Sequence, residues 1–267
     1  MLREHERIGR HRIMKAFIIG AGRGSRLNAL SDHQPKCYAP VGERPILDWI
    51  LEAFDGAGLD ANVFIGGYRM DQIREDYPEL TYCCNEDWEN NNILASLFYA
   101  EEHMGEGFVC SYADILFRDS VVERAMDHPG DIVLCVDTGW ETRYVDRSQH
   151  PADDAEKVTA DGDLVTRVHR AIAAGEAAGE YIGVAKFSPR GAELLREYYH
   201  QSRQAYAGQP WRDAAVFEKA YLIELFQEMI EQGVPVHMVT TDGDYMEIDT
   251  EEDYRLANEK WVKTFAG

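Results

Sequence analysis

The sequence predicts an α/β protein with a mostly parallel central sheet flanked by helices. Short apolar runs that suit buried strands alternate with segments of helical periodicity, and a glycine-rich turn follows the first apolar run. The chain has 267 residues, of which 45% are hydrophobic, enough for a packed core. No repeat, low-complexity tract or linker interrupts it. We therefore expect one domain over residues 14–267 and a disordered extension over residues 1–13.

Each expected element rests on its apolar spacing and on the turn residues that bound it. Strands are expected at residues 16–19, 62–66, 80–84, 108–112, 131–136, 180–187, 234–239 and 245–248, and residues 156–170 form a hairpin around an Asp-Gly turn. Helices are expected at residues 45–56, 70–77, 93–103, 120–128, 189–206 and 214–232. A capping-box pattern that begins at Thr250 starts a terminal helix.

The charge balance excludes several classes of partner. The chain has 48 acidic and 27 basic residues, which give a formal net charge of −21. This field repels nucleic acid and anionic lipid, so we expect neither a nucleic-acid partner nor a membrane partner. The five cysteines show no CxxC spacing and the N-terminus lacks an apolar core, which favours a cytoplasmic protein with reduced thiols. A homodimer is left open, since no motif decides the assembly state.

The glycine-rich turn at residues 20–26 predicts a pocket for a polyanion. Glycine has no Cβ and tolerates positive φ, so backbone N–H groups in such a turn can approach a phosphate closely. Two cations follow, Arg26 at the end of the turn and Lys36 just after Pro35. In a strongly acidic protein, a local pair of cations is the feature that an anionic ligand requires.

Two aspartates stand at the ends of predicted strands, Asp114 after residues 108–112 and Asp249 after residues 245–248. Ligands gather at the carboxyl ends of parallel strands, and paired carboxylates there are typical Mg²⁺ ligands. With the glycine turn, they suit phosphoryl or nucleotidyl transfer, in which catalysis is mainly positioning and charge neutralisation. Asp249 has an alternative role as a cap of the terminal helix.

These residues carry a resemblance to a known family. The run AGRGSRLNALSDHQPKCYAPVGERPILDW resembles the G-x-G-[ST]-R-L…P-K signature of sugar-phosphate and choline-phosphate nucleotidyltransferases. The stretches NNNILASLFYA, SYADILF, GEYIGVAKFS and YMEIDTEEDY follow in order, and they resemble the bacterial phosphocholine cytidylyltransferase branch with its phosphonate-activating relatives. The resemblance covers about residues 14–261. It implies a Rossmann-like nucleotidyltransferase domain that moves CMP from CTP to a small phosphate or phosphonate with Mg²⁺.

The resemblance also implies roles for individual residues. Ala21 and Gly22 would contact the base and ribose, and Asn92 and Ser96 would line the base pocket. The remaining donor-site residues would bind the triphosphate, its α-phosphate and Mg²⁺: Gly24, Ser25 and Arg26 for the triphosphate, Lys36 for the α-phosphate, Asp114 and Asp249 for the metal. Lys36, Arg26 and Asp114 are thus the expected catalytic residues.

The acceptor site is less defined. Four aromatic residues fall where they could wall a pocket for a quaternary ammonium, namely Trp140, Tyr144, Tyr181 and Trp211. Acidic residues nearby could bind a primary ammonium instead, and Lys157 and Lys186 are candidates for holding the substrate phosphate. After the hairpin the family often shows a glycine-lysine pair, where this chain has Val168-His169-Arg170. Phosphocholine is the first expected acceptor, followed by 2-aminoethylphosphonate or another phosphonate.

Three alternatives remain at this point. A dinucleotide-dependent enzyme is disfavoured because the turn reads GxGxG rather than GxGxxG and leads to Pro-Lys. A UTP- or dTTP-dependent sugar-1-phosphate nucleotidyltransferase is a closer rival. A non-catalytic protein of the same fold is disfavoured because Arg26, Lys36, Asp114 and Asp249 are all present.

Overall fold

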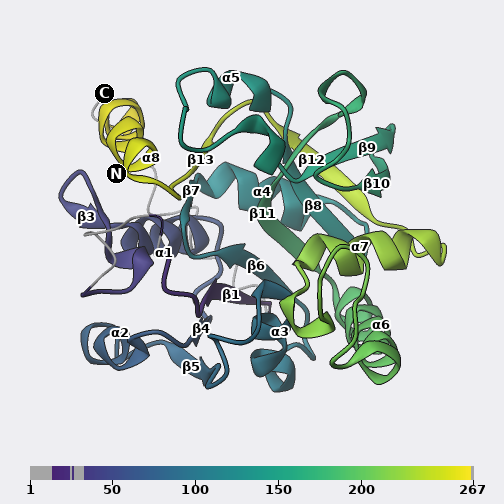
Figure 1. The fold of residues 1–267 in the computed structure, drawn as a ribbon. Coiled ribbons are helices and arrows are strands. Elements are labelled where there is room, and N and C mark those ends of the chain that lie inside the picture. Colours follow the sequence, from purple (N-terminus) through teal and green to yellow (C-terminus); the bar gives the residue numbers. More distant parts are fainter. Residues whose placement is uncertain (1–13, 25, 27–32, 266–267) are drawn as a thin grey trace.

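The computed structural model describes residues 14–24, 26 and 33–265. The expected extension over residues 1–13, and Ser25 of the glycine turn, lie outside the described residues. Within the described part, a nine-stranded sheet forms the centre of the molecule (Figure 1), with the spatial order β5-β4-β1-β6-β11-β8-β12-β10-β9. Its strands are β1 (Lys15–Gly20), β4 (Asn62–Gly66), β5 (Thr81–Cys84), β6 (Phe108–Tyr112), β8 (Ile132–Asp137), β9 (Lys157–Asp161), β10 (Leu164–Val168), β11 (Gly179–Phe187) and β12 (His237–Thr241).

The sheet is mostly parallel, as predicted. Strands β5, β4, β1 and β6 run in one direction, and β12 runs parallel to β8. Strand β11 lies antiparallel between β6 and β8. After β1 the chain adds β4 and β5 on one side and then returns to place β6 on the other. The strand order therefore reverses between β1 and β6, which is where α/β sheets bind their ligands.

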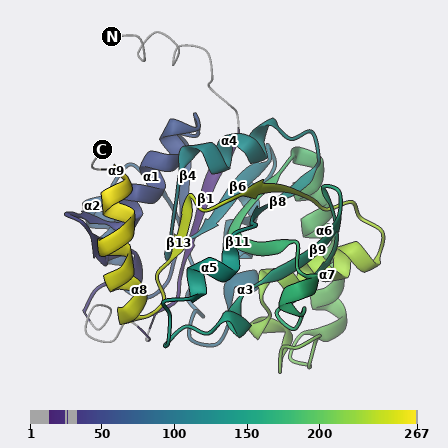
Figure 2. The same cartoon turned by 90° about the horizontal axis from the view of Figure 1, so that it is seen from above.

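Alternating side chains of the sheet build one core on each face. In β1, Phe17 and Ile19 join the core under α3 (Ile93–Leu97), α6 (Pro189–Tyr206) and α7 (Leu222–Glu231). Ala16 and Ile18 join the opposite core under α1 (Ile46–Gly56) and α4 (Asp119–Asp127). This alternation follows from the two-residue period of a strand. The helix α8 (Glu251–Leu256) lies on the α1 side (Figure 2), where Asn258 accepts from the Gly42 N–H at 2.9 Å.

Short elements complete the fold. They are α2 (Met70–Asp76), α5 (Trp140–Tyr144), α9 (Val262–Phe265), a pair of two-residue strands β2 (Pro40–Val41) and β3 (Arg44–Pro45), and a ribbon of β7 (Ile115–Phe117) with β13 (Tyr245–Glu247). None of the helices in the described residues combines the length and apolar character that a membrane crossing requires.

The predicted helix over residues 214–232 is wrong in its first half, because α7 begins only at Leu222. The carboxylate of Glu224 accepts from the N–H groups of Asp213, Ala214 and Tyr221 at 2.6–3.0 Å. A buried side chain therefore satisfies backbone donors that a helix would have used, and the segment before Tyr221 folds as a loop with one 3-10 turn, Phe217–Lys219. The strand expected at residues 234–239 is displaced to His237–Thr241. The sequence did not predict β7 or α5.

Candidate active site

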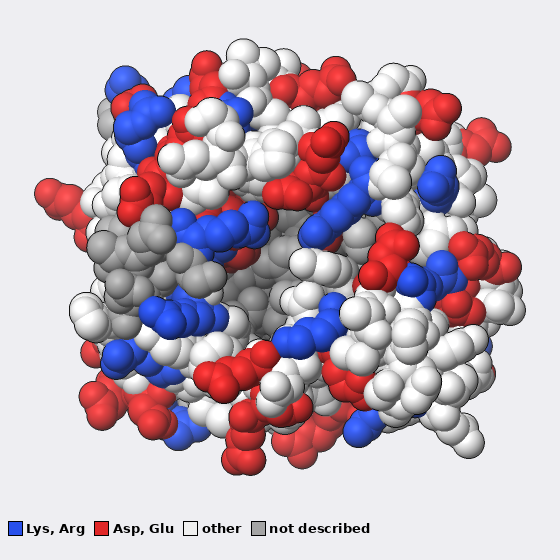
Figure 3. Space-filling model, viewed as in Figure 1, with Lys and Arg blue, Asp and Glu red and all other residues white. Residues whose placement is uncertain are grey.

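A cavity of about 670 Å³ opens at the carboxyl ends of β1 and β6. In Figure 3 this face of the molecule is hollowed at its centre, and Lys and Arg side chains lie around the hollow. Tyr181, from the predicted acceptor set, lines this cavity. So do all the described residues that were predicted for the nucleotide and the metal: Ala21, Gly22, Gly24, Arg26, Lys36, Asn92, Ser96, Asp114 and Asp249.

The glycine turn packs directly on Lys36. Gly24 has a φ of +67°, and a Cβ at this position would lie 2.5 Å from Cδ of Lys36. Any side chain would therefore strain the backbone and displace the lysine. Gly22 has nothing within 4 Å of an added Cβ, so its backbone faces open space at the cavity. Backbone groups of the turn are therefore exposed to a ligand in the cavity, and the turn packs against Lys36 and fixes its side chain.

The ammonium of Lys36 lies between the two predicted metal carboxylates. It donates to Oδ2 of Asp114 at 2.6 Å and also to Oδ1 of Asp249. Burial would lower the pKa of Lys36, but the two aspartates outweigh it and raise that pKa, so the lysine stays charged. Arg26 donates to the other oxygen of Asp249 and lies 3.6 Å from Asp154. Burial acts to raise the pKa of Asp249, whereas Lys36 and Arg26 lower it.

The ribbon of β7 and β13 explains how residues 135 positions apart in the chain meet. Glu247 pairs with Ile115 in this ribbon, and the Ile248 N–H donates to the Asp114 carbonyl at 2.9 Å. The side chain of Asp249 does not cap α8. Thr250 and Asp253 form the predicted capping box instead, which leaves Asp249 to the two cations.

Asn92 and Ser96 shape one wall of the cavity. The Asn92 side chain caps α3 by accepting from the Ile93 N–H at 2.9 Å, and its amide donates to the Lys219 carbonyl at 3.2 Å. The Ser96 hydroxyl donates to the Asn92 carbonyl and accepts from Asn85. These contacts fix the loop before α3, whose Trp88 also lines the cavity and was not predicted.

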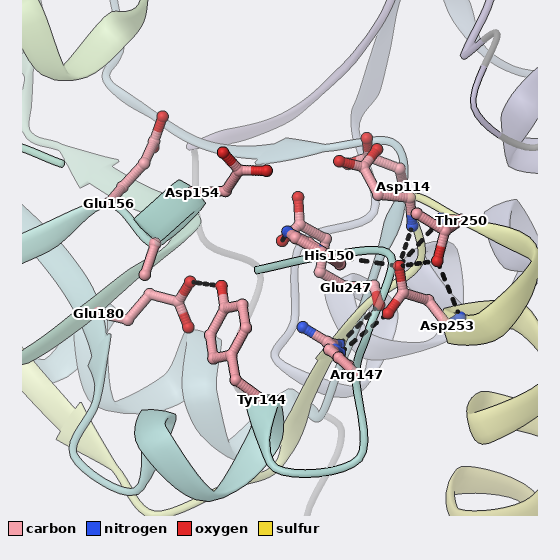
Figure 4. A network of polar contacts seen from close by, with 12 residues as sticks. Asp114, Tyr144, Arg147, His150, Asp154, Glu156, Glu180, Glu247, Thr250 and Asp253 are labelled. Atoms are coloured by element: carbon pink, nitrogen blue, oxygen red, sulfur yellow. Dashed lines mark hydrogen bonds and ion pairs between the residues drawn. The ribbon is translucent and has the colours of Figure 1, made fainter. Parts of the chain in front are cut away.

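The far end of the cavity contains two buried glutamates that the sequence reasoning missed (Figure 4). Glu156 accepts from Arg170 at 3.0 Å, and Glu180 accepts from the Tyr144 hydroxyl at 2.6 Å. No ion pair joins Glu180 to a lysine or arginine of the described residues. Burial raises the pKa of Glu180 to about 7, although Tyr144 opposes the shift. A charged residue inside the apolar strand 180–187 is the signal that could have found it.

Four of the predicted acceptor residues lie elsewhere. Trp140 and Lys157 line a neighbouring cavity of about 490 Å³. Trp211 is buried in the core against Phe217, and the Lys186 ammonium donates to the carbonyls of His128 and Gly130, away from the main cavity. The periodicity of a sequence does not separate an aromatic core residue from a pocket wall. The Tyr144 hydroxyl donates to Glu180 from outside the main cavity, and of the predicted acceptor residues only Tyr181 lines that cavity.

Two further cavity residues that the sequence did not predict lie between the glycine turn and the two buried glutamates. His150 and Glu247 line the cavity next to Asp249, and the ligand atoms of these three side chains lie within 4.8 Å of one another. Burial, with Asp249 and Asp114 nearby, raises the pKa of Glu247 well above its ordinary value. Glu247 stands two residues before Asp249, and a second acidic residue at this spacing is a signal that the sequence offered. The fold and the site together define an α/β enzyme of the nucleotidyltransferase class.

The family follows from a comparison of the sequence with known families. The profile described as MobA-like NTP transferase domain matches residues 16–205, and the chain belongs to this family. The chain is 28% identical to the CTP:phosphoglutamine cytidylyltransferase of Campylobacter jejuni over 258 residues, which are 92% of this chain and 100% of that protein. It is 27% identical to the choline-phosphate cytidylyltransferase of Streptococcus pneumoniae over 40% of this chain and 47% of that protein.

Solved structures show the same fold. The inositol-1-phosphate CTP transferase of T. maritima aligns with a TM-score of 0.70 at 19% identity, over 93% of this chain and 96% of that one. The CTP:phosphocholine cytidylyltransferase of Streptococcus pneumoniae aligns with a TM-score of 0.65 at 18% identity, over 92% and 98%. The sequence matches to cytidylyltransferases confirm the expected resemblance, and the solved structures confirm the expected fold.

Proposed function

We propose that the protein transfers CMP from CTP to the phosphate or phosphonate group of a small acceptor and releases pyrophosphate. The observation that carries this proposal is the Lys36 ammonium, which lies between Asp114 and Asp249 and behind the Gly24 backbone. This arrangement supplies fixed positive charge where an α-phosphate would gain negative charge. The names of the relatives support cytidine as the base of the donor nucleotide.

In the proposed reaction, an oxygen of the acceptor phosphate attacks the α-phosphorus of CTP in line with the leaving group. A P–O bond to the acceptor forms, the bond between the α-phosphorus and the bridging oxygen breaks, and pyrophosphate leaves with that electron pair. Lys36 holds the α-phosphate, and Arg26 holds the departing phosphates at the open side of the cavity, where it is more than half exposed. No covalent enzyme intermediate is required.

The residues at the site fit a divalent cation. Oδ1 of Asp114 is buried and has no hydrogen-bond partner among the described residues. The carboxylates of Asp114 and Asp249 both pair with the Lys36 ammonium, so they lie close together. Oxygen donors of this kind suit Mg²⁺, and Asp114 and Asp249 would hold it. When bound, such an ion neutralises phosphate charge.

The acceptor end supports a substrate with an ammonium group. Glu156 and Glu180 are both buried, Glu156 pairs with Arg170, and no described cation pairs with Glu180. A buried carboxylate without a cation is unfavourable, so a ligand cation stabilises it. Trp140 and Trp211 lie outside the cavity, but Tyr112, Tyr181, Tyr221 and Tyr245 line it, so aromatic contact does not separate a primary from a quaternary ammonium. We place phosphoglutamine before phosphocholine because the phosphoglutamine relative matches 92% of this chain and the choline-phosphate relative 40%.

Pyrophosphate release with each of four nucleoside triphosphates tests the proposal. The acceptor panel is phosphoglutamine, 2-aminoethylphosphonate, phosphocholine, inositol 1-phosphate and glucose 1-phosphate. We expect turnover with CTP and an acceptor that has an ammonium group. The best turnover with UTP or dTTP and glucose 1-phosphate would instead establish the sugar-nucleotide alternative.

A further inference from the structure

His150 is oriented toward the carboxylates of the donor site. Its side chain is only 2% exposed, and its Nε2 lies 3.5 Å from Oε2 of Glu247. With Asp249, these side chains form one of the two groups of three potential metal ligands in the described part of the chain. Figure 4 shows His150 between Glu247 and the acceptor-end glutamates.

The other ring nitrogen of His150 is held by a carboxylate. Oδ2 of Asp253 lies 3.2 Å from Nδ1, and since a carboxylate oxygen accepts, Nδ1–H donates to Asp253 while Nε2 faces Glu247 at the cavity. Asp253 is itself fixed, because Arg147 lies 2.9 Å from Oδ1 and the Thr250 hydroxyl donates to Oδ2 at 2.8 Å. A histidine whose second nitrogen donates to a carboxylate is the usual arrangement of a metal-ligating histidine.

We propose that His150 Nε2 and Glu247 join Asp114 and Asp249 as ligands of the divalent cation of this site, so that its coordination includes one nitrogen atom. Imidazole nitrogen is a ligand of transition metals, whereas Mg²⁺ favours oxygen donors and retains water, so a paramagnetic ion such as Mn²⁺ is the probe that reports the nitrogen. The inference rests on the proposed function only for the use of the ion, since the ligands are present without nucleotide.

The alternative is a purely structural histidine. In that case His150 links Glu247 to Asp253, holds the segment after α5 against the β13–α8 connection, and binds no metal. The two roles of His150 differ in one property that can be measured directly, the presence of a nitrogen ligand on the bound ion.

Pulsed EPR of Mn²⁺ bound to the full-length protein without nucleotide tests the proposal. We expect modulation from a directly coordinated ¹⁴N nucleus in the wild type. In His150→Gln the ¹⁴N modulation should disappear and the calorimetric Mn²⁺ affinity should fall about 10- to 100-fold. Bound Mn²⁺ without nitrogen modulation in the wild type would overturn the inference.

A matched control addresses the second group of potential ligands. His128, Asp163 and His237 lie together at the opposite end of β8 and β12. His237→Gln should keep the ¹⁴N modulation and the Mn²⁺ affinity, and their loss in this variant alone would assign the nitrogen to the other group and overturn the inference. Because the wild-type spectrum needs no variant, a folding defect in His150→Gln does not obstruct the test.

The two proposals fail separately. Nitrogen-coordinated Mn²⁺ without CTP-dependent pyrophosphate release would leave the metal site in place and overturn the proposed function. CTP turnover together with a Mn²⁺ spectrum free of nitrogen modulation would overturn the histidine ligand alone.

Discussion

The two ends of the cavity are built differently. At the donor end, cations and carboxylates pair closely, because Lys36 and Arg26 bind Asp249 and Lys36 also binds Asp114. At the acceptor end, Glu156 pairs with Arg170, but the buried carboxylate of Glu180 has only a tyrosine hydroxyl as its partner among the described side chains. The donor end is therefore preorganised without a ligand, whereas under the proposed function the charge of the acceptor would complete the surroundings of Glu180. Variants at the two ends should accordingly separate donor effects from acceptor effects.

The largest effect is expected for Lys36→Ala. The change removes the cation between Asp114 and Asp249, so turnover should fall about 10²- to 10³-fold. Steady-state pyrophosphate release measures this loss, and a thermal melt establishes folding. Lys260→Ala removes a lysine from a half-exposed surface pair with Asp146 and should leave turnover unchanged. Near-wild-type turnover in Lys36→Ala would refute the catalytic role of the lysine.

Next in size is Glu180→Gln, which addresses the acceptor end alone. The loss of a buried ionic contact to the substrate ammonium should raise the KM of the acceptor about 10- to 100-fold. The KM of CTP should stay within about twofold of the wild type, because Glu180 touches none of the donor-site cations. An equal rise in both KM values would show that the two ends are not separable.

Gly24→Ala should affect the KM of CTP rather than the KM of the acceptor, the reverse of Glu180→Gln. Alanine is disfavoured at a φ of +67° by about 1–2 kcal/mol, and its Cβ meets the Lys36 side chain. The KM of CTP should therefore rise about tenfold or more while the KM of the acceptor changes little. Gly175→Ala is the matched control, because nothing lies within 4 Å of a Cβ there and its φ is not positive. Unchanged CTP binding in Gly24→Ala would contradict the packing of the turn on Lys36.

The pH dependence of acceptor binding should be smaller. The pKa of Glu180 is about 7 in the folded protein, so its carboxylate ionises as pH rises from 6 to 8. The KM for an acceptor with an ammonium group should fall about tenfold over this range, and the profile should flatten in Glu180→Gln. The raised pKa has a second effect with a defined sign. From about pH 4.5 to 7 the folded chain holds this proton more tightly than the unfolded chain, so this group lowers the free energy of unfolding as pH rises.

The smallest effect is expected for Tyr144→Phe. The variant removes the 2.6 Å hydrogen bond to Glu180 but keeps the buried ring, so the acceptor KM should rise only about three- to tenfold at pH 7. A profile shifted to higher pH should accompany this rise, because the hydroxyl favours the charged form of Glu180. A change in KM for CTP rather than for the acceptor would contradict this assignment.

The same contrast explains what the sequence could predict. The donor end uses a strand, a turn and two cations within residues 15–36, and strand-end aspartates, all of which are local patterns. The acceptor end combines Glu156, Arg170, Glu180 and Tyr221, which come from the hairpin, β11 and the loop before α7. Their proximity depends on strand order and on the antiparallel insertion of β11, and no short motif encodes either. The misplaced helix start before α7 has a more local origin, because Glu224 binds the N–H groups of Asp213 and Ala214, eleven and ten residues before it, and helical periodicity does not reveal such a contact.

The hairpin of β9 and β10 and its flanking residues supply the ion pair of the acceptor end from one short segment of the chain. Glu156 immediately precedes it and Arg170 follows it by two residues, so one contiguous stretch of fifteen residues presents both partners of the ion pair to the cavity. The nucleotide turn and the strand-end aspartates belong to other parts of the chain. Under the proposed function, exchange of this stretch between relatives would change the ion pair at the acceptor end and leave the donor end, and Glu180 on β11, as they are.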